Sequence, residues 1–160
     1  MFFIIDYVGM GREFIGREAI LLLNFKSRRE FNIYLAAFVD GEGSFSIHKI
    51  PIQNNRIRVT LRIGNTDYKT MFVISKNLGS NLRRTTTRKT KRGYYIVSIT
   101  GRKAVQITKD IFPFLIAKRR RAKLILRFPT GKIGVPLSCK DAKKRIRLSK
   151  ELSKLNKRKV

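Results

Sequence analysis

Two carboxylates stand two positions apart where an apolar stretch of the chain ends. Asp40 and Glu42 follow residues 31–39, which we expect to form a helix. The C-terminal end of a helix carries partial negative charge, so placing both acids there is unfavourable by roughly a few tenths of a kcal/mol or more. A divalent cation would compensate, because Mg²⁺ binds carboxylate oxygen together with water and substrate phosphate. The alternative, which applies more to Asp40 than to Glu42, is that the acids only accept hydrogen bonds from backbone groups at the turn.

The charge of the chain favours a polyanionic partner. Its 160 residues include 37 Lys and Arg against 10 Asp and Glu, a net charge of +27. Such a charge opposes compaction by self-repulsion unless a polyanion neutralises it, so a nucleic acid is the expected partner. Between Glu42 and Asp110 the only acid is Asp67, whereas Lys and Arg recur throughout that stretch. The central part of the chain is therefore expected to be positive.

The cysteine content and the hydropathy of the chain indicate in which kind of compartment the protein is expected. Cys139 is the one cysteine, which excludes an internal disulfide and fits a reducing, intracellular location, either an organelle matrix or stroma or a prokaryotic cytoplasm. Residues 1–26 are apolar in patches, but charged residues interrupt every run long enough to span a bilayer. We therefore expect an N-terminal extension and no membrane partner.

Capping and stop signals delimit the first helix. Ser27 and Glu30 have the spacing of a capping box, in which each side chain pairs with a free backbone donor near the other residue. The helix should begin there and stop near Gly41 and Gly43, because paired glycines tolerate the conformations that end a helix.

The rest of the chain alternates between hairpins and helices. Alternation of apolar and polar residues predicts four strands, over residues 44–48, 56–63, 81–87 and 94–100. Apolar spacing and capping signals predict further helices, over residues 66–78, 102–111 and 117–126 and around Leu148, Leu152 and Leu155. The order is α-ββ-α-ββ-α with extra terminal helices. We divide the chain into an extension (1–26), a core (27–128) and a basic C-terminal helical segment (129–160).

The strand over residues 56–63 separates an apolar face from a basic face. Its basic face resembles a major-groove contact surface, because Arg to guanine is the commonest specific contact with a base edge, while other side chains only touch phosphate. A solvated sheet edge is the alternative. The residues expected to bind double-stranded DNA are Ser44, Ser46, His48, Arg56, Arg58, Thr60, Arg62, Arg83, Arg88, Lys89, Lys91 and Arg92.

The sequence LAAFVDGEG at residues 35–43 resembles the LAGLIDADG motif in register. Residues 27–126 are similar in element order to the αββαββα core of the LAGLIDADG homing endonucleases, which implies an α+β fold with a DNA-binding antiparallel sheet. Two positions depart from the pattern. Ala37 stands where the family usually has Gly, and Glu42 stands where Asp is commonest, which keeps the carboxylate but lengthens its reach.

The resemblance implies a site-specific DNA endonuclease that makes double-strand breaks at a long, roughly palindromic target with Mg²⁺ as cofactor. One motif supplies one acidic site, so cleavage of two strands requires a homodimer, with Leu35, Ala36 and Val39 at the expected interface. The implied metal ligands are Glu42 and Asp40. The further residues implied for catalysis are Asn65, which would hold the attacking water, and Lys118 and Lys69, which would lie near the scissile phosphate.

Two other functions stay open. A member of the same family that has lost cleavage would serve as an intron RNA maturase or as a DNA- or RNA-binding protein. A small basic ribosomal protein would explain the charge but not the two acids at the helix end. RNA-binding sheets also tend to expose stacking aromatics, whereas the clearest strand here exposes Arg and Thr.

Overall fold

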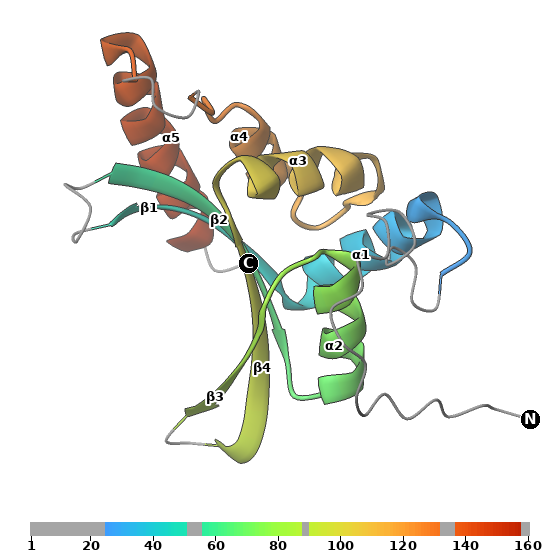
Figure 1. The fold of residues 1–160 in the computed structure, drawn as a ribbon. Coiled ribbons are helices and arrows are strands. Elements are labelled where there is room, and N and C mark those ends of the chain that lie inside the picture. Colours follow the sequence, from blue (N-terminus) through green and yellow to red (C-terminus); the bar gives the residue numbers. More distant parts are fainter. Residues whose placement is uncertain (1–24, 51–55, 88–89, 132–136, 158–160) are drawn as a thin grey trace, which may run out of the picture.

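An antiparallel four-stranded sheet in the order β1-β2-β4-β3 lies at the centre of the protein (Figure 1). The computed structural model describes residues 25–50, 56–87, 90–131 and 137–157, without the side chains of residues 87 and 90–92. The strands are β1 (Gly43–Ile50), β2 (Arg56–Asn65), β3 (Leu82–Thr87) and β4 (Thr90–Thr100). Each neighbouring pair is antiparallel.

Helices connect the hairpins and cover one side of the sheet (Figure 1). They are α1 (Arg28–Glu42), α2 (Tyr68–Asn77), α3 (Gly101–Ile111), the 3₁₀ turn η2 (Phe112–Phe114), α4 (Arg119–Leu126) and α5 (Cys139–Lys157). This order confirms the αββαββα core, from α1 to α3, with the additional helices α4 and α5 after it. Within the described residues, no helix is both long and apolar enough to cross a lipid bilayer.

The predicted start of α1 is confirmed, although its capping box is rearranged. Ser27 Oγ accepts a hydrogen bond from the Glu30 N–H at 3.1 Å, as expected. The Glu30 carboxylate accepts from the N–H of Lys26 at 2.7 Å instead of from that of Ser27. The second helix, predicted over residues 66–78, spans Tyr68–Asn77. Gly79 follows it with a φ of +52°, in the left-handed region that favours glycine after a helix.

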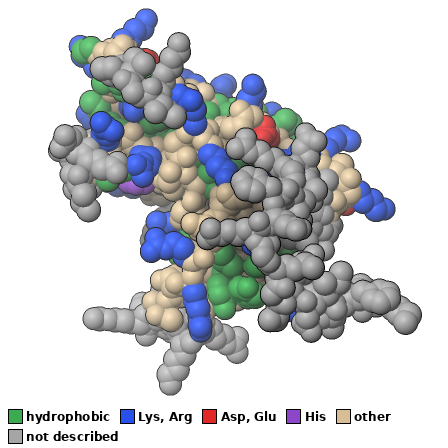
Figure 2. Space-filling model, viewed as in Figure 1, with side chains coloured by type: hydrophobic (Ala, Val, Ile, Leu, Met, Phe, Trp, Pro, Cys, Tyr) green, Lys and Arg blue, Asp and Glu red, His purple; other side chains and the backbone are tan. Residues whose placement is uncertain are grey.

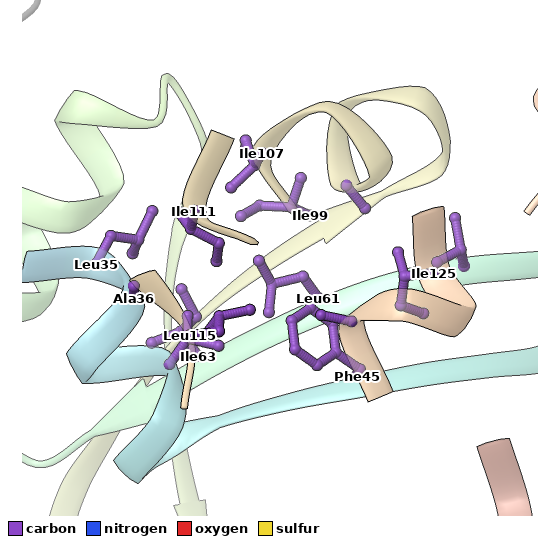
Figure 3. Close-up of a cluster of buried hydrophobic side chains, with 14 of the residues drawn as sticks. Leu35, Ala36, Phe45, Leu61, Ile63, Ile99, Ile107, Ile111, Leu115 and Ile125 are labelled. Atoms are coloured by element: carbon purple, nitrogen blue, oxygen red, sulfur yellow. The ribbon is translucent and has the colours of Figure 1, made fainter. Parts of the chain in front are cut away.

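The apolar sides of the sheet and helices form one buried cluster (Figure 3). Phe45, Leu61, Ile63 and Ile99 project from the strands and are at most 2% exposed. The helices and the segment after η2 contribute residues that are equally buried: Leu35, Ala36, Ile111, Leu115, Ile125 and Leu148. At about 25 cal/mol per Å² of buried apolar surface, this cluster is the dominant favourable contribution to folding. It holds the end of α1 close to the start of β1 and the end of β2, which pair with each other.

Helix α5 covers the outer edge of the sheet. Ser149 Oγ donates to the carbonyl oxygen of Ile47 at 2.7 Å, and Asn156 Nδ2 donates to that of Phe45 at 3.2 Å. An edge strand otherwise presents unpaired carbonyls to solvent or to another chain. Helix α5 therefore fixes β1, and Leu148 and Leu152 on the same helix join the buried cluster.

Candidate functional site

Helix α1 ends where the chain enters β1. Gly43 closes the helix by donating its N–H to the carbonyl of Val39, and its φ of −85° is available to any residue. A Cβ at this position would lie 2.8 Å from Val39 Cα and O, so the glycine is required by space. Gly43 was therefore predicted correctly as a residue that ends the helix, but the glycine is needed for space and not for its conformational freedom. This tight junction places Glu42 at the last turn of α1, directly before the sheet.

The Asp40 carboxylate is engaged by backbone donors of another element. Its Oδ2 accepts from the N–H groups of Ile116 at 2.6 Å and Ala117 at 3.1 Å, and its Oδ1 accepts from the N–H of Lys118 at 2.8 Å. Three consecutive N–H groups that point at one carboxylate form a favourable site for its negative charge. Asp40 therefore holds the turn that leads into α4, from a position 76 to 78 residues earlier in the chain.

The Lys118 ammonium makes the reciprocal contacts. Its Nζ donates to the carbonyl oxygens of Val39 at 2.8 Å, Asp40 at 2.8 Å and Gly41 at 3.2 Å. A cation is favourable at the C-terminal end of a helix, where the carbonyls lack partners within the helix. Desolvation by burial lowers the pKa of Lys118, as does the nearby charge of Arg121, while Asp40 and Glu42 oppose that shift.

The Glu42 carboxylate, in contrast, is available. Glu42 is exposed. Within the described part of the chain, its carboxylate accepts no hydrogen bond and forms no salt bridge. No cluster of three or more His, Cys, Asp or Glu side chains suited to a metal lies among the described residues. One free carboxylate still fits Mg²⁺, which takes one or two carboxylates and completes its shell with water and phosphate.

Asn65 and Lys69 lie at the same end of the hairpin as Glu42. Gly43 pairs with Ile63 across β1 and β2, so Glu42 lies at the end of this hairpin where β2 continues to Asn65, which pairs with Tyr95 of β4. Asn65 Oδ1 accepts from the N–H of Asp67 at 2.9 Å. Lys69 is exposed in the first turn of α2. The structure thus brings Asn65 and Lys118 to the end of the sheet where Glu42 lies, with Lys69 one turn farther on.

The strand register places the expected basic residues on one face. Ser44 lies opposite Arg62, Ser46 opposite Thr60, and His48 opposite Arg58, and residues directly opposite in an antiparallel pair share a face. Ile50 lies opposite Arg56 in the same way. Arg83 is exposed on the same face through its pairing with Ile96. Figure 2 shows Lys and Arg side chains distributed from α5 down to the β3–β4 hairpin, with few acidic ones between them.

Some expected DNA contacts are less accessible than others. Thr60 is 5% exposed, and its hydroxyl has no hydrogen-bond partner among the described residues. A buried hydroxyl without a partner is unfavourable, so we expect water or a ligand group to satisfy it. Arg88 and Lys89 lie outside the described residues, as do the side chains of Lys91 and Arg92.

The two sides of α1 have different surroundings. Leu35, Ala36 and Val39 are completely buried and belong to the protomer's own core. Figure 3 shows Leu35 and Ala36 within this cluster. They are therefore closed to a second copy while the protomer keeps this packing. The exposed side of the helix carries Ile33, Tyr34, Ala37 and Gly41. A Cβ at Gly41 would meet nothing within 4 Å, so the protomer's own packing does not require glycine there.

Two features had no signal in the sequence. The hydrogen bonds of Asp40 with the turn before α4 join residues far apart in the chain, and no sequence pattern at either place predicts them. The same holds for a groove of about 490 Å³ between α2 and the β3–β4 hairpin, whose lining includes Tyr68, Phe72, Arg84 and Tyr95. Both depend on how the helices pack on the sheet.

Comparison with known proteins supports a family assignment. Residues 35–132 match a family described as LAGLIDADG endonuclease. The homing endonuclease I-CvuI, in complex with its target, is similar in structure with a TM-score of 0.64 and 22% identity over 82% of this chain and 85% of that chain. The archaeal intron-encoded homing endonuclease I-Vdi141I, complexed with DNA, gives 0.63 and 20% over 81% and 86%. Homing endonuclease I-TnaI gives 0.55 and 18% over 78% and 92%.

At these identities the structural likeness shows the fold alone. No significant match was found among curated proteins. The family match nevertheless covers more than half of the 160 residues.

Proposed function

Because this chain belongs to the LAGLIDADG endonuclease family, we propose that it is a site-specific DNA endonuclease that hydrolyses phosphodiester bonds in both strands of a long, roughly palindromic target. The observation that carries the proposal is the exposed Glu42 carboxylate at the end of the motif helix, next to a basic sheet face. Surface charge alone would explain nucleic-acid binding but not an unpaired acid at that place.

Hydrolysis requires a polarised phosphate, an activated water and a stabilised leaving oxygen. The water oxygen bonds to phosphorus, and the bond from phosphorus to the departing sugar oxygen breaks. The proton that the water loses ends on the departing oxygen, which leaves as a hydroxyl group. Glu42 would hold Mg²⁺, which when bound lowers the pKa of water and neutralises developing charge on the phosphate. Asn65 would orient the water. Lys118 and Lys69 would contribute positive charge close to the phosphate.

The basic face would provide the DNA contacts. Arg58 and Arg62 project from β2 beside His48 and Ser44 of β1, which is the arrangement that a two-stranded ribbon needs to contact base edges in the major groove. Residues nearer the hairpin ends, including Arg83, would contact phosphate and set the register on the duplex.

A second copy would meet the exposed side of α1. Ile33 is 45% exposed and Tyr34 is 37% exposed, although both are large hydrophobic side chains. Large apolar side chains that are exposed together can mark a surface that binds another protein. The small residues Ala37 and Gly41 lie four positions apart on that side and would let two α1 helices approach closely. Such a homodimer would bring both Glu42 carboxylates into one site.

Cleavage of a defined DNA tests this proposal. A binding sequence can be selected from random duplexes in Ca²⁺, which accepts looser coordination than Mg²⁺, and the selected duplex then incubated with Mg²⁺. We expect a double-strand break at one position from the wild-type protein. Glu42→Gln keeps the size of the side chain but removes its charge, so cleavage should fall by about two orders of magnitude or more while binding persists.

Glu42→Asp is the matched control, because it retains the carboxylate and should retain part of the activity. Near-normal cleavage by Glu42→Gln would remove Glu42 from the mechanism. Binding of structured RNA in preference to every selected duplex, without cleavage, would favour the RNA-binding alternative.

A further inference from the structure

We propose that Asp40 is a positioning residue: with Lys118 it joins the end of α1 to the start of α4 and thereby fixes Glu42. The proposal rests on the proposed function, in which Glu42 is the metal-binding acid. It assigns Asp40 a role other than metal binding, although the two acids stand only two positions apart. Six hydrogen bonds between the two helix ends, which we call the interlock, carry the proposal.

Asp40 supplies half of the interlock. Both of its carboxylate oxygens accept from consecutive backbone N–H groups, those of residues 116, 117 and 118, at 2.6 to 3.1 Å. Binding a metal through the same oxygens would compete with these donors, which belong to the turn directly before α4. Loss of a hydrogen-bond partner for a backbone N–H group is unfavourable, so the carboxylate is better used to hold this turn.

Lys118 supplies the other half. An ammonium group has three N–H donors, and three carbonyl oxygens of α1 lie 2.8 to 3.2 Å from its Nζ. The three N–H donors of Lys118 are therefore all used by the three carbonyl oxygens at the end of α1. In this arrangement Lys118 acts as a fixed positive charge beneath the acidic turn rather than as a free donor for phosphate.

The interlock controls Glu42 because it holds the turn that precedes it. Val39, Asp40 and Gly41 are each bonded to Lys118 through their carbonyls, and Gly43 contacts Val39 too closely to accept even a Cβ. Glu42 lies between these anchored residues, while its own carboxylate stays exposed. Loss of the Asp40 contacts would let the last turn of α1 shift and move that carboxylate.

A shift of this kind should affect the chemical step more than binding. Misplacement of a catalytic group by about 1 Å can cost roughly a hundredfold in rate. The DNA-binding face is held separately by strand pairing and by α5. We therefore expect a loss in cleavage rate at nearly constant DNA affinity.

Asp40→Asn tests the proposal in the full-length protein. The amide keeps one acceptor oxygen but turns an NH₂ group toward backbone donors. Single-turnover cleavage in Mg²⁺ should slow by about tenfold to a hundredfold, with the DNA dissociation constant in Ca²⁺ within about threefold of wild type by the reasoning above. Ser27→Ala is the control for stability, because it removes a cap from the opposite end of α1. It should lower the unfolding temperature without slowing cleavage.

Hydrogen exchange gives a readout that does not depend on cleavage. The amides of residues 116–118 should be protected in the wild type and in Ser27→Ala, and should lose protection in Asp40→Asn. Normal cleavage or retained protection in Asp40→Asn would overturn the proposal. So would a raised Mg²⁺ requirement with these amides still protected, which would make Asp40 a metal ligand. If the wild type cleaves no DNA, the proposed function fails and the exchange result alone decides whether the interlock exists.

Discussion

At the scale of single residues, the surroundings of an acid decide what it can do. Asp40 is surrounded by backbone N–H groups, whereas Glu42 faces solvent without a partner among the described residues. Asp67 is a third case: it caps α2 through the N–H groups of Lys69 and Thr70 and through the Thr70 hydroxyl. Carboxylates used as caps stabilise helices, and the free one is left for chemistry.

Asp67 leads to a prediction about pH. The hydrogen bond from the Thr70 hydroxyl is the main cause that lowers the pKa of Asp67 from its ordinary 3.8, with help from backbone N–H groups and against desolvation. A carboxyl with a depressed folded pKa contributes stability above its unfolded pKa, and this contribution is lost as the pH falls through the folded value. In Asp67→Asn that part of the acid dependence should be absent.

Thermal unfolding at a series of pH values between about 2 and 6 measures this effect, since the window must span the ordinary and the lowered pKa. The difference in unfolding temperature between wild type and Asp67→Asn should shrink as the pH falls below 3.8. A constant difference across the series would show that Asp67 is not stabilised in its charged form.

At the scale of elements, α1 has to serve two surfaces. Leu35, Ala36 and Val39 pack into the core, while Ala37 and Gly41 remain on the open side. The interlock ties the end of this helix to α4, and the contacts of α5 tie down β1. Helix α1 is therefore held in place by its own protomer, and in the proposed dimer its exposed side would contact a second copy.

Substitution on the two sides of α1 should have different consequences. Ala37→Leu places bulk on the open side and should weaken dimerisation, with a dissociation constant raised about 5- to 150-fold if overpacking costs 1 to 3 kcal/mol. Ala36→Leu overpacks the core and should instead lower the free energy of unfolding of the protomer, by about 1 to 3 kcal/mol. Sedimentation equilibrium measures the dimer dissociation constant, and unfolding in urea measures the free energy of unfolding. A monomeric wild type that still cuts both strands would refute the dimer.

At the scale of the whole molecule, the proposed function divides DNA binding into two parts: the net charge would set affinity and the basic sheet face would set sequence specificity. A net charge of +27 on 160 residues makes binding to any polyanion favourable. Release of counterions makes such binding fall with salt, with a slope near 0.9 for each phosphate contact on a logarithmic plot. Contacts with base edges add preference for particular sequences.

Arg58→Ala and Arg62→Ala should therefore relax preference at particular base pairs, by about 1 to 3 kcal/mol each. Substitutions of the basic residues among positions 88–92 should lower affinity for all duplexes alike and reduce the salt slope. Lys109→Ala is the matched control, because Lys109 is exposed on α3, which covers the helical side of the sheet. Binding to randomised duplexes at several salt concentrations measures all three. Equal loss for every sequence from Arg58→Ala would mean that this face contacts only phosphate.

Much of the fold was predictable because its signals are local. Three such signals are the cap at Ser27, the glycine at position 79 after α2 and the alternation along β2. Each acts within a few residues, so the local sequence is enough to predict it. The strand over residues 94–100 was predicted too short, because β4 begins at Thr90. Turn-like basic residues there continue the ladder, as the pairing of Thr87 with Thr90 shows.

The sequence by itself determined the apolar helix, the two acids at its end, the basic strand face and the excess of positive charge, since spacing and composition suffice for these. Tertiary structure decided which side of α1 is buried and which of the two acids is left free. The bonds of Asp40 and Lys118 join residues 76 to 79 positions apart, and those of α5 to β1 join residues 102 and 111 apart. Such contacts arise only when the core brings distant helix ends together, because no local pattern specifies the partner of a capping carboxylate.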